Sequence, residues 1–181
     1  AFPYPHYTQV TREDSDAIFA YLQSQPAVAE PNRAHALRFP YNTQAALGVW
    51  RALFFTPGAP QPEATQTAEY NRGAYLVNGL GHCTACHTPR NALGATTDAK
   101  AFTGGLIPVQ NWYAPALNAA HEAGVKEWKT EDVVALLKTG VAPQGSVLGP
   151  MAEVVFRSTQ YLSDADARAM AVYLQALPQQ E

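Results

Sequence analysis

The chain has 181 residues, of which 47% are hydrophobic and 15% charged, so it can form one domain of ordinary size with an additional segment. Twelve basic and 15 acidic residues give a formal net charge of −3, and the lack of any basic run argues against a nucleic-acid partner. The longest apolar run, residues 47–55, is interrupted by Arg51 and is too short for a membrane span, which needs roughly 20 residues. Because the sequence begins with Ala1-Phe2-Pro3 instead of methionine, we expect a processed form or a piece of a longer protein.

Two helices are predicted in the first third of the chain. Thr11-x-x-Asp14 has the pattern of a helix start and opens an apolar stripe that extends to residue 25. A second helix is predicted over residues 42–55, and a loop rich in proline and glycine follows it. We therefore expect residues 1–63 to form a mostly helical N-terminal arm and linker, and residues 64–181 to form the main domain.

The main domain is predicted to contain three further helices joined by long loops. The first covers roughly residues 69–80 and runs directly into the two cysteines of the chain. The second covers residues 130–139, with Thr130 as its cap, and the third covers residues 163–177 and ends at Pro178. The pattern favours an all-α fold.

The N-terminal helix repeats the last helix of the chain. A shift of 152 positions aligns residues 10–26 with residues 162–178 and gives six identities in seventeen positions, including Asp14 with Asp166 and Tyr21 with Tyr173. Any two amphipathic helices share some resemblance, which is one interpretation. The other is a duplicated domain, of which only the closing helix is present at the N-terminus.

Cys83 and Cys86, followed at once by His87, are the only cysteines of the chain. Structural zinc needs four ligands, and a second paired cluster is missing from the sequence. A thiol-disulfide redox pair normally follows a strand, whereas a helical pattern leads into this motif. The third interpretation is one covalently bound haem c, in which the two thiols form thioethers with the vinyl groups and His87 binds the iron.

A methionine as second iron ligand would favour the reduced state of the haem. Met170 lies on the apolar stripe of the last helix and is predicted to belong to the core. Met151 lies in a loop that contains Gly149 and Pro150, and it is the preferred candidate, although a methionine can also fill a gap under a loop. His121 is the one serious competitor, in what reads as an exposed turn beside an acidic residue.

Three separated stretches resemble the C-terminal haem domain in the multi-haem cytochrome c subunits of bacterial membrane-bound dehydrogenases, such as those for alcohol, gluconate, fructose and aldehydes. These stretches are YNRGAYLVNGLGHCTACHTPRN at 70–91, GGLIPVQNWYAPAL at 104–117 and the segment 149–178. Residues 1–22 resemble the end of the preceding haem domain in such subunits. The resemblance implies a class I cytochrome c fold around one haem, preceded by the arm.

The resemblance also implies roles for individual residues. Cys83 and Cys86 would be the thioether sites, His87 the proximal ligand and Met151 the distal ligand. Arg90, Trp112 and Tyr113 match positions near the haem propionates, and Gly73 and Tyr173 match the crossing of the first and last helices. Where relatives carry the distal methionine of the preceding domain, nine residues before the helix cap, this chain has Phe2, which cannot bind iron.

These observations predict an electron-transfer protein and not an enzyme. It would accept electrons from a dehydrogenase subunit or another cytochrome domain and pass them to quinone or a terminal oxidase. Its expected location is periplasmic, with a larger complex as one means of holding it at the outer face of the inner membrane. The alternative is a haem enzyme or a gas or redox sensor in which Met151 is labile and leaves the iron open.

Overall fold

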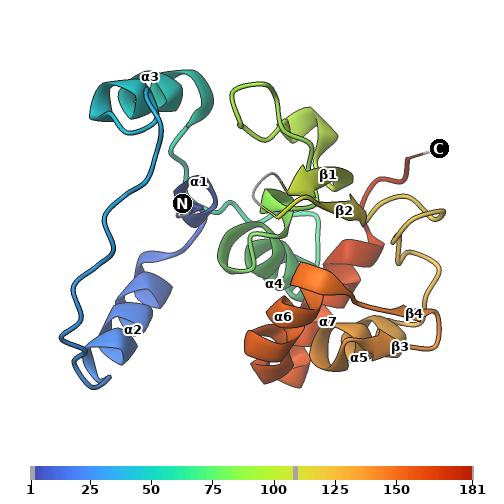
Figure 1. Cartoon of the computed structure of the whole chain (residues 1–181). Coiled ribbons are helices and arrows are strands. Elements are labelled where there is room, and N and C mark those ends of the chain that lie inside the picture. The colour runs from blue at the N-terminus through green and yellow to red at the C-terminus, as the bar shows by residue number, and fades with distance from the viewer. Residues whose placement is uncertain (1–2, 108–109, 181) are drawn as a thin grey trace.

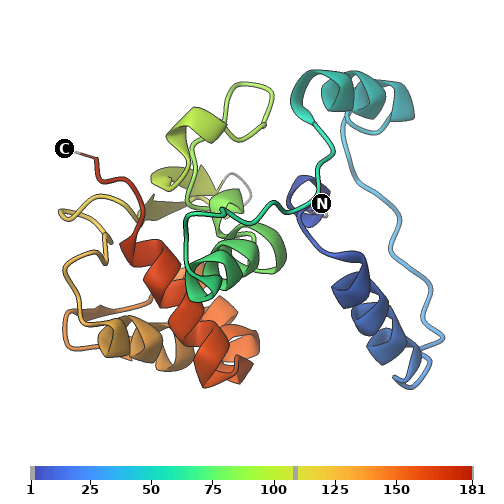
Figure 2. The same cartoon turned by 180° about the vertical axis from the view of Figure 1, so that it is seen from behind.

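The N-terminal third of the chain lies beside the remainder as an extended arm (Figure 1). The computed structural model describes residues 3–107 and 110–180, so Phe2 lies outside the described residues. We use "arm" for residues 3–63 and "C-terminal domain" for residues 64–180. Figures 1 and 2 show that α2 (Arg12–Gln23) and α3 (Gln44–Phe54) stand away from the helices of the C-terminal domain, whereas α1 (Tyr4–Tyr7) lies close to them.

The arm contains α1 (Tyr4–Tyr7), α2 (Arg12–Gln23) and α3 (Gln44–Phe54). The two longer helices begin at threonine caps: the side-chain oxygen of Thr11 accepts from the backbone N–H of Asp14, and that of Thr43 accepts from Ala46. Both predicted arm helices are confirmed, each one or two residues shorter at either end. No residue of α2 or α3 is buried, so the arm has little apolar core of its own.

The described residues of the C-terminal domain form four α-helices, short helical turns and two small hairpins. Its helices and turns are α4 (Ala68–Tyr75), the π-turn η1 (Leu76–Leu80), η2 (Cys83–Ala85), η3 (Asp98–Lys100), α5 (Thr130–Thr139), α6 (Gly149–Arg157), η4 (Thr159–Tyr161) and α7 (Asp164–Gln175). The hairpins pair β1 (Thr103–Ile107) with β2 (Trp112–Ala116) and β3 (Val141–Ala142) with β4 (Gly145–Ser146), both antiparallel. The predicted all-α class is confirmed, because strands make up only a small share of the chain.

The core forms where α4 crosses α7 and where α5 packs on α7. A Cβ added to Gly73 would lie 2.8 Å from the Cβ of Tyr173 and closer still to the carbonyl oxygen of Ala169, so only glycine lets the two backbones approach this closely. The predicted crossing of Gly73 and Tyr173 is therefore present. Ten buried apolar side chains fill the surrounding cluster: Leu76, Val77, Phe102, Val125, Val133, Leu137, Met170, Ala171, Leu174 and Leu177.

Several local features differ from the sequence prediction. The helix predicted over 69–80 changes from α to π geometry at Leu76, and Lys129, not Thr130, occupies the cap position of α5. The side chain of Thr130 instead donates to Gln175 of α7. The β1–β2 hairpin and helix α6 were not predicted, because short strands and a helix that starts with Gly-Pro carry weak sequence signals. Among the described helices, none has the length and apolar character needed to cross a membrane.

Candidate haem attachment site

The two cysteines lie in a tight turn at the end of η1. Gly81 continues the helical ladder by donating to the carbonyl of Leu76, and a Cβ at Gly81 would lie 2.8 Å from that oxygen. His82 then adopts a left-handed conformation with φ of 39°, which reverses the chain into η2. The backbone N–H groups of Cys86 and His87 both donate to the carbonyl of Cys83, at 3.2 and 3.0 Å. This turn places the two thiols and the imidazole on one short segment.

The environment of the thiols does not suit thiol-disulfide chemistry. Burial raises the pKa of Cys83 to about 12, and it also raises the pKa of Cys86 in spite of the nearby Arg90. A redox-active or nucleophilic cysteine needs the opposite change, because the thiolate is the reactive form. Within residues 3–107 and 110–180, no three His, Cys, Asp or Glu side chains gather as a metal-binding cluster.

His87 is oriented as a metal ligand by its second ring nitrogen. Its Nδ1 lies 2.7 Å from the backbone carbonyl oxygen of Pro115, which can only accept, so Nδ1 carries the proton and Nε2 keeps its lone pair. Burial lowers the pKa of His87, although the bond to Pro115 opposes this shift, and the neutral ligand form is favoured. The backbone N–H of Gly104 donates to the carbonyl of His87 at 3.1 Å, which ties the motif to β1.

The structure places Met151 in the first turn of α6 and not in a loop, with its side chain half-buried. The ring of Trp112 on β2 covers the start of this helix, since a Cβ at Gly149 would meet that ring at 2.7 Å. Met170 is 3% exposed and belongs to the core cluster, as predicted. The His121 side chain is 71% exposed, and its Nε2 lies 3.9 Å from Glu122. The assignment of Met151 as distal ligand stays a prediction.

Of the three residues predicted near the haem propionates, Arg90 and Tyr113 form hydrogen bonds within the protein. Arg90 donates to the carbonyls of Gly94 and Ala85, at 2.8 and 2.6 Å, and so braces the turn between the cysteines. The hydroxyl of Tyr113 donates to Glu122 at 3.1 Å. Trp112 is 47% exposed beside α6. Their contacts with propionates stay predictions.

One set of contacts at the attachment turn was missed by the sequence analysis. His6 of the arm lies 3.2 Å, Nδ1 to Oγ1, from Thr84, which stands between the two cysteines. The ring of His82 lies 5.9 Å from that of Tyr7 in an edge-on arrangement. These residues are far apart in the sequence and follow no shared pattern, so only the tertiary structure brings them together.

The chemistry of this site fits a covalently attached haem. It offers two protonated thiols in a C-x-x-C turn and a neutral imidazole oriented for ligation through Nε2. Strand β1 also lies close to the residues after His87, because a Cβ at Gly105 would be 2.5 Å from the carbonyl oxygen of Thr88. Fold and site together define a small helical protein of the c-type haem class.

Comparisons with known proteins agree with this class. The cytochrome c family model matches residues 70–178. One subunit of the nicotinate dehydrogenase of Pseudomonas putida is 40% identical over 178 residues, which are 98% of this chain and 15% of that protein. The cytochrome c subunit of the quinone alcohol dehydrogenase of Gluconobacter oxydans is 39% identical, and the fructose dehydrogenase cytochrome subunit of Gluconobacter japonicus is 37% identical. Both alignments include 98% of this chain. The aligned region is 39% of the length of the Gluconobacter oxydans protein and 37% of the length of the Gluconobacter japonicus protein.

The chain belongs to the cytochrome c family. Its single C-x-x-C motif, Cys83 and Cys86, holds one covalent haem c, and its function is electron transfer. The predictions of cofactor, fold class and electron-carrier function are thereby confirmed. The chain spans well under half of the length of the three relatives named above.

Proposed function

We propose that this chain is the haem-bearing part of the cytochrome subunit of a dehydrogenase complex. It receives single electrons from a dehydrogenase subunit or a neighbouring haem and passes them to quinone or a terminal oxidase. The proposal is supported by similarity along 98% of the chain to cytochrome subunits of alcohol and fructose dehydrogenases. We also propose a periplasmic location, with a larger complex as one means of holding the chain at the outer face of the inner membrane; the same similarity supports it.

The observation that carries the electron-transfer role is the fixed imidazole of His87. Its Nδ1 donates to the carbonyl of Pro115, and this bond would hold the ring orientation when Nε2 binds the iron. We further propose Met151 as the distal ligand, because it is half-buried at the start of α6 and because the other methionine, Met170, belongs to the core. If His87 and Met151 both bind the iron, it would exchange electrons and would not bind substrate.

The division at residues 63 and 64 is also part of this proposal. The family match begins at residue 70, and α2 shares its cap and apolar pattern with α7, the closing helix of the C-terminal domain. We therefore interpret residues 1–63 as the closing helix of a preceding cytochrome domain followed by a connecting helix.

The test is to produce the chain in a host that matures c-type cytochromes. The purified protein should gain the mass of one haem, and the Cys83→Ala/Cys86→Ala variant should gain none. Reduced wild-type protein should bind no carbon monoxide, whereas Met151→Ala should bind it. Binding of carbon monoxide by the wild-type protein would contradict the filled sixth position and would favour the open-site alternative.

A further inference from the structure

The start of the arm runs antiparallel to the segment that leads into the haem attachment turn. As the arm runs back from Asp14 to His6, its contacts move from Tyr75 on α4 to Thr84 in the turn. Three separate contacts lie along this path. They join the arm to the end of α4, to η1 and to the residues between the cysteines.

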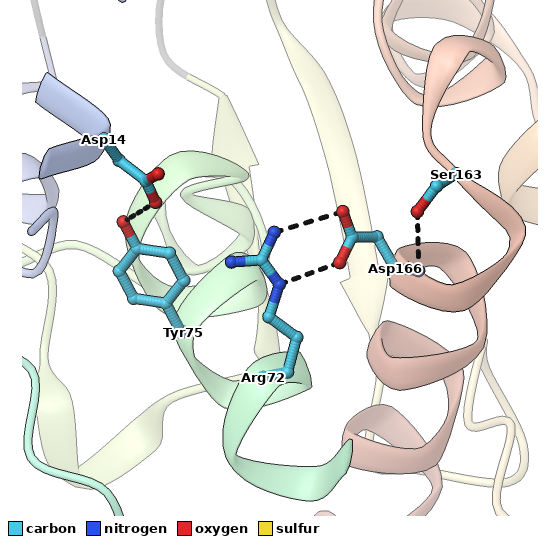
Figure 3. A network of polar contacts seen from close by, with 5 residues as sticks. All are labelled: Asp14, Arg72, Tyr75, Ser163 and Asp166. Atoms are coloured by element: carbon cyan, nitrogen blue, oxygen red, sulfur yellow. Dashed lines mark hydrogen bonds and ion pairs between the residues drawn. The ribbon is translucent and has the colours of Figure 1, made fainter. Parts of the chain in front are cut away.

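The first contact is made by the hydroxyl of Tyr75. It donates to Asp14 at 2.6 Å (Figure 3). It also accepts from the backbone N–H of Thr11 at 3.2 Å, and both partners lie at the start of α2. One turn earlier on α4, Arg72 donates twice to Asp166, at 2.7 and 3.1 Å. Asp14 and Asp166 are equivalent in the 152-residue repeat, so α4 binds the same position of both repeated helices.

The guanidinium carbon of Arg72 lies 5.5 Å from the centre of the Tyr75 ring. This cation–π contact joins the two bonds into one group. The start of α2 is therefore held by Tyr75 of α4, whose ring contacts the Arg72 side chain that is bonded to α7.

The second contact lies on η1. A Cβ added to Gly79 would be 3.4 Å from the Cβ of Gln9, so the arm backbone lies directly on this turn. The third contact is the bond between His6 and Thr84. The ring of His82 lies 6.3 Å from that of His6 and 5.9 Å from that of Tyr7, so arm side chains lie against the attachment turn.

We propose that residues 6–14 form a splint that holds the attachment turn in place, shields it from water and thereby raises the reduction potential of the haem. The proposal rests on haem c at Cys83 and Cys86. Thr84 is covalently joined to Cys83, so a polar contact at Thr84 lies next to the attached group. Oxidised haem carries one more positive charge than reduced haem, and water stabilises that charge; exclusion of water therefore favours the reduced state.

The test uses two variants that remove splint contacts without changing a haem-binding residue. Tyr75→Phe removes both bonds to the start of α2, and His6→Phe removes the bond to Thr84. The matched controls are Tyr21→Phe on α2, where the wild-type residue is 66% exposed, and His35→Phe at an exposed position of the arm.

Two measurements are made on the haem-loaded full chain. Hydrogen exchange of amides 4–23 should become about tenfold faster in Tyr75→Phe, because these bonds resist local opening. Spectroelectrochemical titration should show a lower reduction potential in both variants. The one-electron equilibrium should shift about threefold toward the oxidised haem, which is about 30 mV at 59 mV per tenfold change. Both control variants should match the wild type in both measurements.

Unchanged potentials in the two haem-loaded variants would overturn the splint, whether or not exchange becomes faster. Equal shifts in the controls would overturn it as well, because exposed arm residues would then have the same effect. A wild-type chain that gained no haem in a competent host would instead overturn the haem attachment on which the proposal rests.

Discussion

Helices α2 and α7 share a sequence pattern but differ in their surroundings. Each begins at a hydroxyl cap, Thr11 or Ser163, that accepts from the backbone of an aspartate three residues later. Five residues of α7 are buried, whereas none of α2 is. The difference arises because α7 lies across α4 at Gly73, whereas α2 touches α4 through its first turn.

This comparison separates the formation of a helix from its contribution to stability. Cap and apolar spacing are local, so both copies form helices. Burial needs a partner surface, and the positions equivalent to buried Met170, Ala171 and Leu174 are Ile18, Phe19 and Leu22, which are 45%, 62% and 61% exposed. Equivalent substitutions in the two helices should therefore have unequal effects.

The largest loss of stability is expected where α7 packs against α4. Gly73→Ala should lower the free energy of unfolding by about 3 kcal/mol, since the new methyl group meets the backbone of Ala169. Gly48→Ala in α3 is the control, because no atom lies within 4 Å of its Cβ position; it should stabilise α3 by up to about 1 kcal/mol. Urea unfolding followed by circular dichroism measures the free energy of unfolding of both variants. Equal losses of stability in the two variants would contradict the close crossing of α4 and α7.

The next prediction compares the apolar face of α7 with that of α2. Met170→Ala should cost about 2 to 3 kcal/mol, because the side chain is 3% exposed in the core and its removal leaves a cavity. The equivalent change Ile18→Ala should alter stability by no more than about 0.5 kcal/mol. The same unfolding experiment applies. A cost for Ile18→Ala as large as that for Met170→Ala would show that α2 is buried in solution.

The caps at Ser163 and Thr11 should stabilise their own helices by similar amounts, but their loss should affect different parts of the chain. Ser163→Ala should lower global stability by about 1 kcal/mol, because it removes the bond to the backbone of Asp166. Thr11→Ala removes the same type of bond in α2, but it should accelerate hydrogen exchange only in the arm. Faster exchange in α4 or α5 on loss of the Thr11 cap would mean that the arm and the domain unfold together.

The smallest effect concerns the ion pair between Arg72 and Asp166. The bond from Arg72 lowers the pKa of Asp166 below 3.8, so the pair stabilises the folded state fully above that pH and less as the pH falls through the lowered pKa. Asp166→Asn should cost about 0.5 kcal/mol at neutral pH, a small value because solvent screens this half-exposed pair. The difference from the wild type should shrink below pH 3.8. A constant difference across this range, in thermal unfolding at several pH values, would contradict the pairing.

Much of the fold could be predicted because it rests on local signals. The caps at Thr11 and Ser163 and the apolar spacing of the main helices each act within a few residues. The β1–β2 hairpin and α6 were missed, since their stability comes from contacts such as the ring of Trp112 over Gly149. The thioether cysteines and the presence of His87 in the motif were predicted, because they are consecutive in the sequence.

The sequence by itself determined the class of protein, since the C-x-x-C-H motif binds haem through residues that are neighbours in the chain. Only the tertiary structure decided how the site is tuned. Pro115 orients His87 from 28 residues away, and His6 reaches Thr84 across 78 residues. Hydrogen bonds of this kind join segments that no local periodicity relates, so their existence depends on how the whole chain packs.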